Sequence, residues 1–143
     1  SKPTVQFISD ALFARVLSGE SAMNKTVREV FVGAMSADAI LRLDRLKKHS
    51  KIIITSGDRS DMILAAIESN CVGIVLTNNI LPPPNIIARA ANMNIPLLLT
   101  KGDTFQIAKK IDQSVPLLSH TDTKKLALWK TLIEENIDWR QLL

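Results

Sequence analysis

The chain has 143 residues, of which 46% are hydrophobic and 22% charged, and its formal net charge at pH 7 is +4. This length and composition predict one globular domain with its own hydrophobic core and exclude an intrinsically disordered chain. The longest apolar runs are only a few residues long, far short of the ~20 residues of a spanning helix, so no membrane partner is expected.

A reducing, cytoplasmic location is the default expectation. The single cysteine, Cys71, can form no internal disulfide and lies in an apolar run that predicts a buried strand. No basic and then apolar leader precedes the first predicted helix, so the sequence shows no secretion signal.

The basic residues do not predict a nucleic-acid partner. Nucleic-acid surfaces usually combine cations with aromatic side chains on which bases stack, but this chain has no Tyr and only 4% aromatic residues. Cations at the end of a helix also complement its dipole, and we therefore interpret the densest basic cluster as a solvated helix end. That cluster consists of Arg42, Arg45, Lys47, Lys48 and Lys51.

The first elements in chain order are a helix and two strands. A helix is expected near residues 5–12, followed by a short extended run at residues 15–17 that Ser18, Gly19 and Glu20 close. Residues 27–32 alternate in a pattern that favours a strand with one partly exposed face.

A second helix is expected after the turn at residues 33–35. Ser36 is placed to cap this helix. Ala39, Leu43 and Leu46 would then form one apolar stripe along it.

Three units of the same order, strand, polar loop and helix, come next. Repetition of this order predicts a parallel sheet with all three loops at one edge, and ligands bind at that edge in open parallel sheets. The strands are expected at residues 52–54, 73–76 and 96–99, the loops at 55–59, 77–79 and 100–104, and the helices from about Ser60, Asn85 and Thr104.

The fold class that follows is α/β, a three-layer sandwich with a mainly parallel central sheet flanked by helices. We expect an α/β domain over residues 1–114. Residues 115–143 would form a connection containing Pro116 and a C-terminal amphipathic helix that packs on this domain or on an adjoining one. The apolar stripe of that helix consists of Leu126, Trp129, Ile133 and Ile137.

The two chain ends suggest a piece of a longer polypeptide. The chain starts at Ser1 with no initiator Met, and its last residues include Trp139, Leu142 and Leu143, which are unusual side chains to leave in water. The alternative, in which this tail folds back over its own domain, is equally open.

The first loop contains one residue that needs a partner. Gly57 allows a tight turn there, and Asp58 or Ser60 can cap the following helix. Arg59 is a cation near the positive end of the helix dipole, where something anionic has to compensate it. An ion pair with Asp58, Asp61 or Asp103 would do so, and so would an anionic ligand.

The other two loops supply turn residues and a cap. Asn78 and Asn79 stand where the backbone is expected to need a positive φ, which Asn tolerates best after Gly. In the third loop Lys101 provides one cation, and Asp103, followed by Thr104, provides a strong helix cap. The set Gly57, Asp58, Arg59, Thr77, Asn78, Asn79, Asp103 and Thr104 is the candidate ligand-binding site.

The sequence contains no recognisable catalytic machinery. His49 and His120 have no nucleophile or acid at a useful spacing, and we interpret both as surface histidines. Cys71 is interpreted as an inert core thiol. Neither a phosphate-binding Gly-Lys-Ser/Thr loop nor metal-ligand spacing is present, so no cofactor or metal is expected.

The order of these motifs resembles the DRTGG domain. The resemblance rests on the runs at residues 32–36, 57–61, 74–77 and 103–104, and it covers roughly residues 5–111. That domain occurs in the middle of long bacterial phosphate acetyltransferases, beside CBS domains in some regulated pyrophosphatases, and in stand-alone proteins. The tail also resembles, more loosely, the stretch that follows the domain in the acetyltransferases.

Asp58, Arg59 and Thr77 match the D, R and T of the family pattern, whereas Asn78 and Asn79 replace its two glycines. If those glycines serve backbone geometry, Asn is a tolerable substitute. If they let a ligand approach the bare backbone, two side chains now stand in its way.

The resemblance implies a fold like the N-terminal domain of HPr kinase and a non-catalytic regulatory and dimerisation module. It further implies a homodimer that controls the other domains of its polypeptide in response to a small metabolite or nucleotide. The fragment itself is then no enzyme, and its parent chain would be a phosphate acetyltransferase or a stand-alone relative. Residues 81–87 and the apolar tail are candidate dimer surfaces.

A phospho-acceptor receiver domain is the alternative reading. Such domains place an Asp, a Thr and a Lys at the ends of successive strands, and Asp58, Thr77 and Lys101 superficially supply that set. However, Asp58 lies beyond its predicted strand, and no acidic pair ends an earlier strand to hold Mg²⁺.

Overall fold

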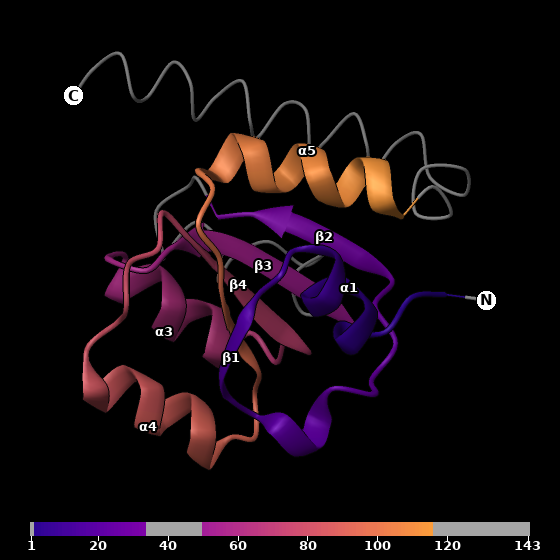
Figure 1. Ribbon diagram of the computed structural model, residues 1–143. Helices are drawn as coiled ribbons and strands as arrows, with labels where there is room; N and C mark the ends of the chain where they lie inside the picture. Colours follow the sequence, from indigo (N-terminus) through magenta and orange to yellow (C-terminus); the bar gives the residue numbers. More distant parts are fainter. Residues whose placement is uncertain (1, 34–49, 116–143) are drawn as a thin grey trace.

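The computed structural model describes residues 2–33 and 50–115 (Figure 1). The helix predicted after Ser36, both histidines and the predicted C-terminal helix lie outside the described residues.

A five-stranded, mostly parallel mixed sheet forms the centre of the described chain. The strands are β1 (Arg15–Ser18), β2 (Glu29–Val32), β3 (Lys51–Ser56), β4 (Gly73–Thr77) and β5 (Leu97–Leu99), and their order in the sheet is β1-β5-β4-β3-β2. The strands β2 to β5 are parallel to one another, and β1 pairs antiparallel with β5. All of β4 and β5 is buried, as expected for strands that helices cover on both faces.

Four α-helices surround the sheet: α1 (Val5–Ala11), α3 (Ser60–Glu68), α4 (Pro84–Asn92) and α5 (Thr104–Ser114). The three predicted helix starts after the parallel strands are confirmed within one residue. Local chemistry sets these starts, since Pro84 occupies the first position of α4. Asp103 and Gln106 form a capping box at the start of α5.

The core has two halves, one on each face of the sheet. Alternate residues of β3 point to opposite faces, so Ile53 packs with the α3 and α4 side, whereas Ile52 and Ile54 pack with the α1 and α5 side. Each of these isoleucines is 0% exposed, and burying one contributes about 1.5–3 kcal/mol. Figure 1 shows α3 and α4 on one side of the sheet and α5 with α1 on the other.

The helix connections change sides between β4 and β5. The helix that follows β4, α4, packs on the same face as α3, whereas α5, the helix that follows β5, packs on the opposite face. A crevice at the carboxyl ends of two strands whose connections diverge in this way is the usual ligand position in open α/β sheets. In this fold a ligand is therefore expected at the carboxyl ends of β4 and β5.

At the opposite end of the strands, Lys51 is 0% exposed. Its assignment to a solvated basic surface is therefore wrong for this residue. Lys51 stands in register with Glu29 on the neighbouring strand, and its ammonium donates a hydrogen bond to the Ser69 carbonyl. Burial lowers the pKa of Lys51, while the negative charge of Glu29 acts to raise it.

Cys71 lies near Lys51 just before β4 and is 5% exposed. The expectation that this cysteine lies in the core is confirmed, and burial raises the pKa of its thiol to about 12, which disfavours the reactive thiolate. No helix within residues 2–33 and 50–115 has the length and apolar character needed to cross a membrane.

Candidate functional site at the carboxyl ends of the strands

The loops after β3, β4 and β5 meet at one edge of the sheet, as the sequence predicts. The backbone N–H of Asn78 donates to the Gly102 carbonyl at 2.8 Å, and that of Asn79 donates to the Thr100 carbonyl at 2.8 Å. The side-chain amide of Asn78 reaches the other neighbouring loop and donates to Ser56 Oγ at 3.0 Å. We call this surface, formed by residues 56–59, 77–79 and 100–104, the rim.

Threonine hydroxyls close the crevice between β4 and β5 below the rim. Thr77 is 0% exposed, and its Oγ1 lies 3.0 Å from Oγ1 of Thr104. Thr100 donates its hydroxyl proton to the Leu76 carbonyl at 2.8 Å. Hydrogen-bonded threonine side chains therefore occupy the space between the ends of β4 and β5, where the fold favours a ligand. A ligand of this site would contact the outer surface of the rim instead.

Asn78 and Asn79 adopt the left-handed backbone conformation expected for them. Their φ angles are +66° and +53°, in the region that Gly and Asn tolerate best. In this chain both positions therefore require a backbone conformation that glycine would also adopt. Both asparagines are exposed, and the Asn78 amide also lies 3.3 Å from Thr77 Oγ1, on top of the closed crevice.

Gly57 is needed for a close approach between two loops. A Cβ atom at this position would lie 1.7 Å from the carbonyl oxygen of Ile80. The φ of Gly57 is not among the positive ones, so the tight turn expected of it does not depend on special backbone freedom. The β3 loop can pack this closely against the β4 loop only because Gly57 has no side chain.

Arg59 forms the ion pair that was one of its two expected roles. Its Nε lies 3.2 Å from Asp61 Oδ1, and a terminal guanidinium nitrogen lies 3.4 Å from Asp61 Oδ2. Arg59 itself occupies the N-cap position of α3, which has no side-chain cap, so the predicted capping by Asp58 or Ser60 is wrong. The hydrogen bond from Arg59 is the main cause that lowers the pKa of Asp61.

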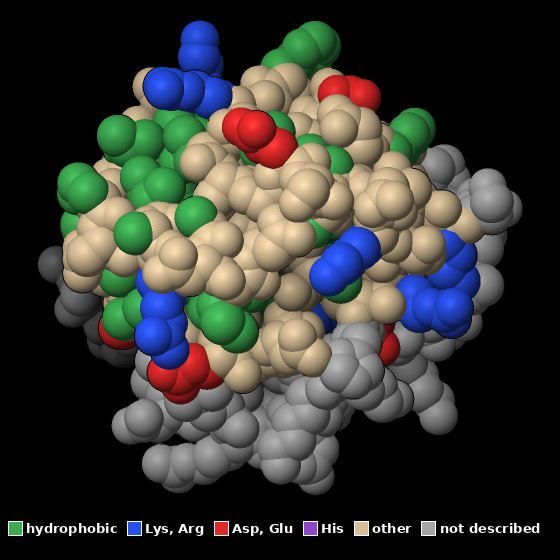
Figure 2. Space-filling view, turned by 90° about the horizontal axis from the view of Figure 1, so that it is seen from below, with side chains coloured by type: hydrophobic (Ala, Val, Ile, Leu, Met, Phe, Trp, Pro, Cys, Tyr) green, Lys and Arg blue, Asp and Glu red, His purple; other side chains and the backbone are tan. Residues whose placement is uncertain are grey.

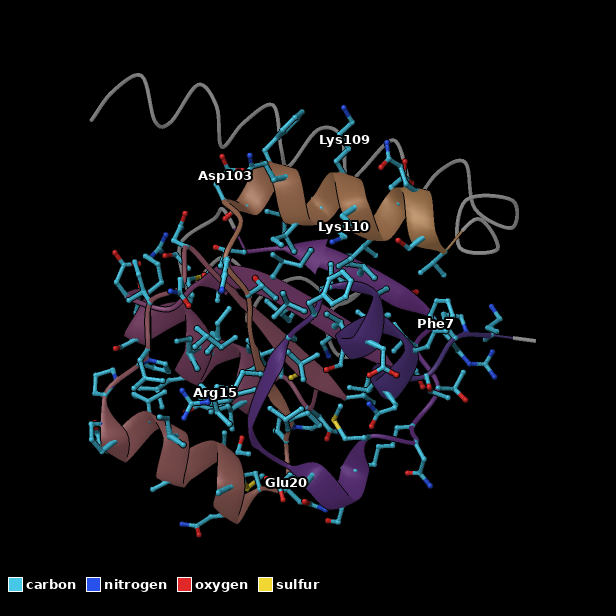
Figure 3. All side chains as sticks on the ribbon, viewed as in Figure 1. Phe7, Arg15, Glu20, Asp103, Lys109 and Lys110 are labelled. Atoms are coloured by element: carbon cyan, nitrogen blue, oxygen red, sulfur yellow. The ribbon has the colours of Figure 1, made fainter. Side chains whose placement is uncertain are left out.

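The accessible polar groups of the rim do not make it strongly basic. Asp58 and Lys101 are exposed, and Asp103 is half-buried because it accepts the N–H of Gln106 as a helix cap; Figure 3 labels Asp103 where α5 begins. Together with the Arg59–Asp61 pair, the described charges of this region are two cations and three carboxylates. Within the rim Asp58 and Asp103 balance Arg59 and Lys101, and Asp61 lies just beside it, so the rim has no excess positive charge for an anion.

The structure brings together all eight predicted site residues but buries part of the set. The predicted site did not include Ser56 and Thr100. The Ser56 hydroxyl accepts a hydrogen bond from Asn78, and the Thr100 hydroxyl donates one to the Leu76 carbonyl. In the sequence, only a small hydroxyl residue at the end of each strand could have indicated these contacts. The alternative of a phospho-acceptor receiver domain does not fit this geometry. Asp58 lies two residues beyond the end of β3, not at the strand end, and Thr77 is buried. Within the described ranges, no group of three or more His, Cys, Asp or Glu side chains could hold a metal ion.

Comparison with known proteins identifies the family of this arrangement. The family model described as "DRTGG domain" matches residues 8–114. The phosphate acetyltransferase of Synechocystis sp. is 32% identical over 145 residues, which cover 95% of this chain and 20% of the relative. The phosphate acetyltransferase of Nitratidesulfovibrio vulgaris is 26% identical over 99% of this chain and 21% of its own length.

A third relative is the uncharacterized protein YtoI of Bacillus subtilis, 25% identical over 80% of this chain and 25% of its own length. The chain thus spans only about a fifth to a quarter of the curated relatives named here.

One solved structure shares the fold, with a TM-score of 0.64 and 27% sequence identity over 78% of this chain and 47% of the other. It contains the CBS and DRTGG domains of the regulatory region of Clostridium perfringens pyrophosphatase, complexed with the activator diadenosine tetraphosphate. The family match, the shared fold and the motif positions agree, and the chain belongs to the DRTGG domain family.

Proposed function

We propose that this chain is a non-catalytic regulatory and dimerisation module of a longer cytoplasmic polypeptide, a phosphate acetyltransferase or a stand-alone relative. Its three layers would correspond to those of the HPr kinase N-terminal domain. Its rim would receive a small metabolite or nucleotide and pass the response to the other domains. The observation that carries this proposal is the convergence of three loops at the carboxyl edge of the sheet.

The rim suits a binding surface better than a reaction centre. The hydroxyls of Thr77 and Thr104 bond to each other, and that of Thr100 donates to the Leu76 carbonyl, so these groups are already engaged and are poorly placed to act as nucleophiles or proton donors. Asp58, Asn78 and Asn79 remain exposed and offer both acceptors and donors to a polar ligand. Because the loops also contact each other, a ligand that binds one loop would alter the packing of the next.

A nucleotide is the effector class that the related regulatory region favours, since that protein was crystallised with diadenosine tetraphosphate. A phosphate group at the rim of this chain would need Arg59 to share its guanidinium between Asp61 and the ligand. Lys101, which is exposed on the next loop but one, supplies the second positive charge.

The dimer surface we propose includes residues 81–87, next to the rim. Leu81 is 55% exposed, and Met93 at the end of α4 is also 55% exposed. Figure 2 views the molecule from below and shows apolar side chains gathered toward one side of this face. Pro83 and Pro84 keep the segment stiff, so little conformational entropy would be lost on association.

The test is a thermal-shift screen of nucleotides and organic acids against the full chain. A ligand at 100 times its Kd should add about 2.7 kcal/mol to the free energy of unfolding. Substitution Arg59→Ala should abolish that shift and leave the far-UV circular dichroism spectrum unchanged. The matched control is Arg89→Ala, because Arg89 is an exposed arginine of α4 away from the rim.

Loss of the shift in both variants, or in neither, would contradict a site at the rim. Unfolding of Arg59→Ala would show that the Arg59–Asp61 pair serves the fold alone. Sedimentation velocity of Leu81→Asp tests the dimer separately, and we expect a lower apparent mass than that of the wild type at equal concentration.

A further inference from the structure

The turn between α1 and β1 contains a phenylalanine with an unusual backbone conformation. Phe13 has a φ of +52°, in the left-handed region where a residue with a side chain is strained and glycine is not. Elsewhere in the described ranges, the non-glycine residues with a positive φ are four asparagines and one serine, which are small and polar. A bulky residue with this backbone is an outlier that needs a reason.

The hydrogen bonds of this turn explain the conformation but not the residue. The N–H of Phe13 donates to the Asp10 carbonyl at 3.1 Å, and that of Ala14 donates to the Ser9 carbonyl at 2.9 Å. These two bonds form the Schellman motif that ends many helices, and glycine is the usual residue at the position of Phe13. Glycine would therefore serve the fold at least as well.

The side chain of Phe13 adds little to the core. Phe13 is 87% exposed, more than any other large hydrophobic residue in the described chain. The Lys110 ammonium on α5 lies 4.7 Å from the centroid of its ring, in a cation–π contact that covers one face. Figure 3 shows Lys110 on the side of α5 that faces α1. A strained residue whose ring is held in place but left open to solvent indicates a role in binding.

Phe13 lies beside the third loop of the rim. Arg15, the first residue of β1, pairs in antiparallel register with Leu99, the last residue of β5. Two positions beyond this pair, the chain reaches Phe13 on the β1 side and the exposed Lys101 on the β5 side. Because Lys101 is part of the rim, the open ring adjoins the surface at which we place the effector.

An aromatic ring next to cations favours a nucleotide as the ligand. A base stacks on the open face of such a ring, and phosphate oxygens pair with nearby ammonium groups. Lys101 and Lys110 supply the positive charge here, and the exposed carboxylate of the same turn, Asp10, accepts a hydrogen bond from Gln6 at 2.9 Å. A nucleic-acid strand would need several stacking side chains in a row, whereas this turn offers one ring, which suits a single nucleotide.

We propose that Phe13 is the base-stacking residue of the rim. A nucleotide would place its base on the open face of the Phe13 ring and its phosphates toward Lys101 and Arg59. This inference rests on the proposed function of the rim and adds to it the residue that recognises the base. Lys110 orders the ring before the ligand arrives, which lowers the entropic cost of binding.

Isothermal titration calorimetry of the full chain with ATP and with tripolyphosphate, which lacks the base, tests the proposal. Phe13→Gly should weaken ATP binding about 10- to 100-fold, as expected for the loss of one base–aromatic stack. It should leave the affinity for tripolyphosphate unchanged. Because glycine suits a positive φ, the same substitution should raise the midpoint of thermal unfolding. A loss of ATP affinity in a more stable variant cannot come from unfolding.

Two other exposed phenylalanines provide matched controls. Phe7 is 50% exposed on α1, and Figure 3 shows it far from Asp103, which belongs to the rim. Phe105 is 46% exposed on the first turn of α5 and has an ordinary helical backbone. Phe7→Ala and Phe105→Ala should each leave the affinity for ATP unchanged.

Three results would overturn the proposal: no binding of ATP to the wild type, an ATP affinity that Phe13→Gly leaves unchanged, or a lower thermal midpoint in Phe13→Gly. The third would show that Phe13 serves the fold. Arg59→Ala separates this inference from the proposed function. ATP binding that depends on Arg59 but not on Phe13 would leave the rim without the stack, and the opposite result would support the stack and contradict the phosphate role of Arg59.

Discussion

The two ends of the parallel strands differ in how far their charged and amide side chains are exposed to solvent. At the carboxyl end, the rim keeps its hydroxyl and amide groups bonded between loops, and Asp58 and both asparagines face solvent. At the amino end, Lys51 is completely buried beside Glu29 and Cys71. The rim thus keeps a layer of exposed polar side chains above its buried threonines, whereas Lys51 at the amino end lies wholly in the core, and substitutions should affect the two ends differently.

The largest effect is expected for Lys51→Ala. The variant loses the hydrogen bond to the Ser69 carbonyl and removes the positive charge beside the buried Glu29, which should cost about 3–5 kcal/mol. Urea unfolding measures this loss. The double variant Lys51→Met with Glu29→Leu removes both charges and should lose less; if it loses as much, the pair is not what stabilises this end.

Gly57→Ala is the corresponding substitution at the rim. The added Cβ would clash with the Ile80 carbonyl, which lies 1.7 Å from its ideal position. We expect a loss of about 3 kcal/mol in the free energy of unfolding, at the upper end of overpacking effects. Gly102→Ala is the control, since its Cβ would meet only side-chain atoms at 3.1 Å or more. Equal losses would mean that close loop packing is not special to Gly57.

High pH should weaken the amino end through Cys71. The unfolded thiol ionises above a pKa of about 9, whereas the folded thiol, with its pKa raised to about 12, keeps its proton. The unfolded state therefore binds fewer protons in this range, and the stability of the wild type relative to Cys71→Ala should fall by about 1.4 kcal/mol per pH unit above pH 9. Parallel stability curves for the two proteins between pH 9 and pH 11 would show that the thiol is not shielded.

The smallest effect concerns the backbone of the rim. Asn79→Val puts a β-branched residue at a φ of +53° and should cost about 1–2 kcal/mol. Asn79→Gly keeps this backbone conformation accessible and should change stability by only a few tenths of a kcal/mol. Thermal unfolding of both variants compares them, and equal midpoints would refute the claim that conformation alone matters at this position.

The sequence predicted the strands, the helix starts and the meeting of the three loops because each follows from local patterns. Apolar runs followed by turn residues locate the strands, and Asp103 with Gln106 marks the start of α5. The positive φ of Asn78 and Asn79 is likewise a local property.

The missed features depend on distant partners. Burial of Lys51 is set by Glu29 and Ser69, which are 22 and 18 positions away in the sequence. The closed crevice depends on the contact of Thr77 with Thr104 across 27 positions. No periodicity carries that information, so Thr77 could be assigned to the rim but not recognised as buried.

The pairing of α1 with α5 has a consequence for how this domain could be used. Val5 and Ile8 near the beginning share one core cluster with Ile111 and Val115 near the end, so the described domain starts and finishes on the same face. Such a unit can be inserted into a larger protein through two adjacent connections, with little strain on either neighbour. The α3 and α4 face would then stay clear of both connections.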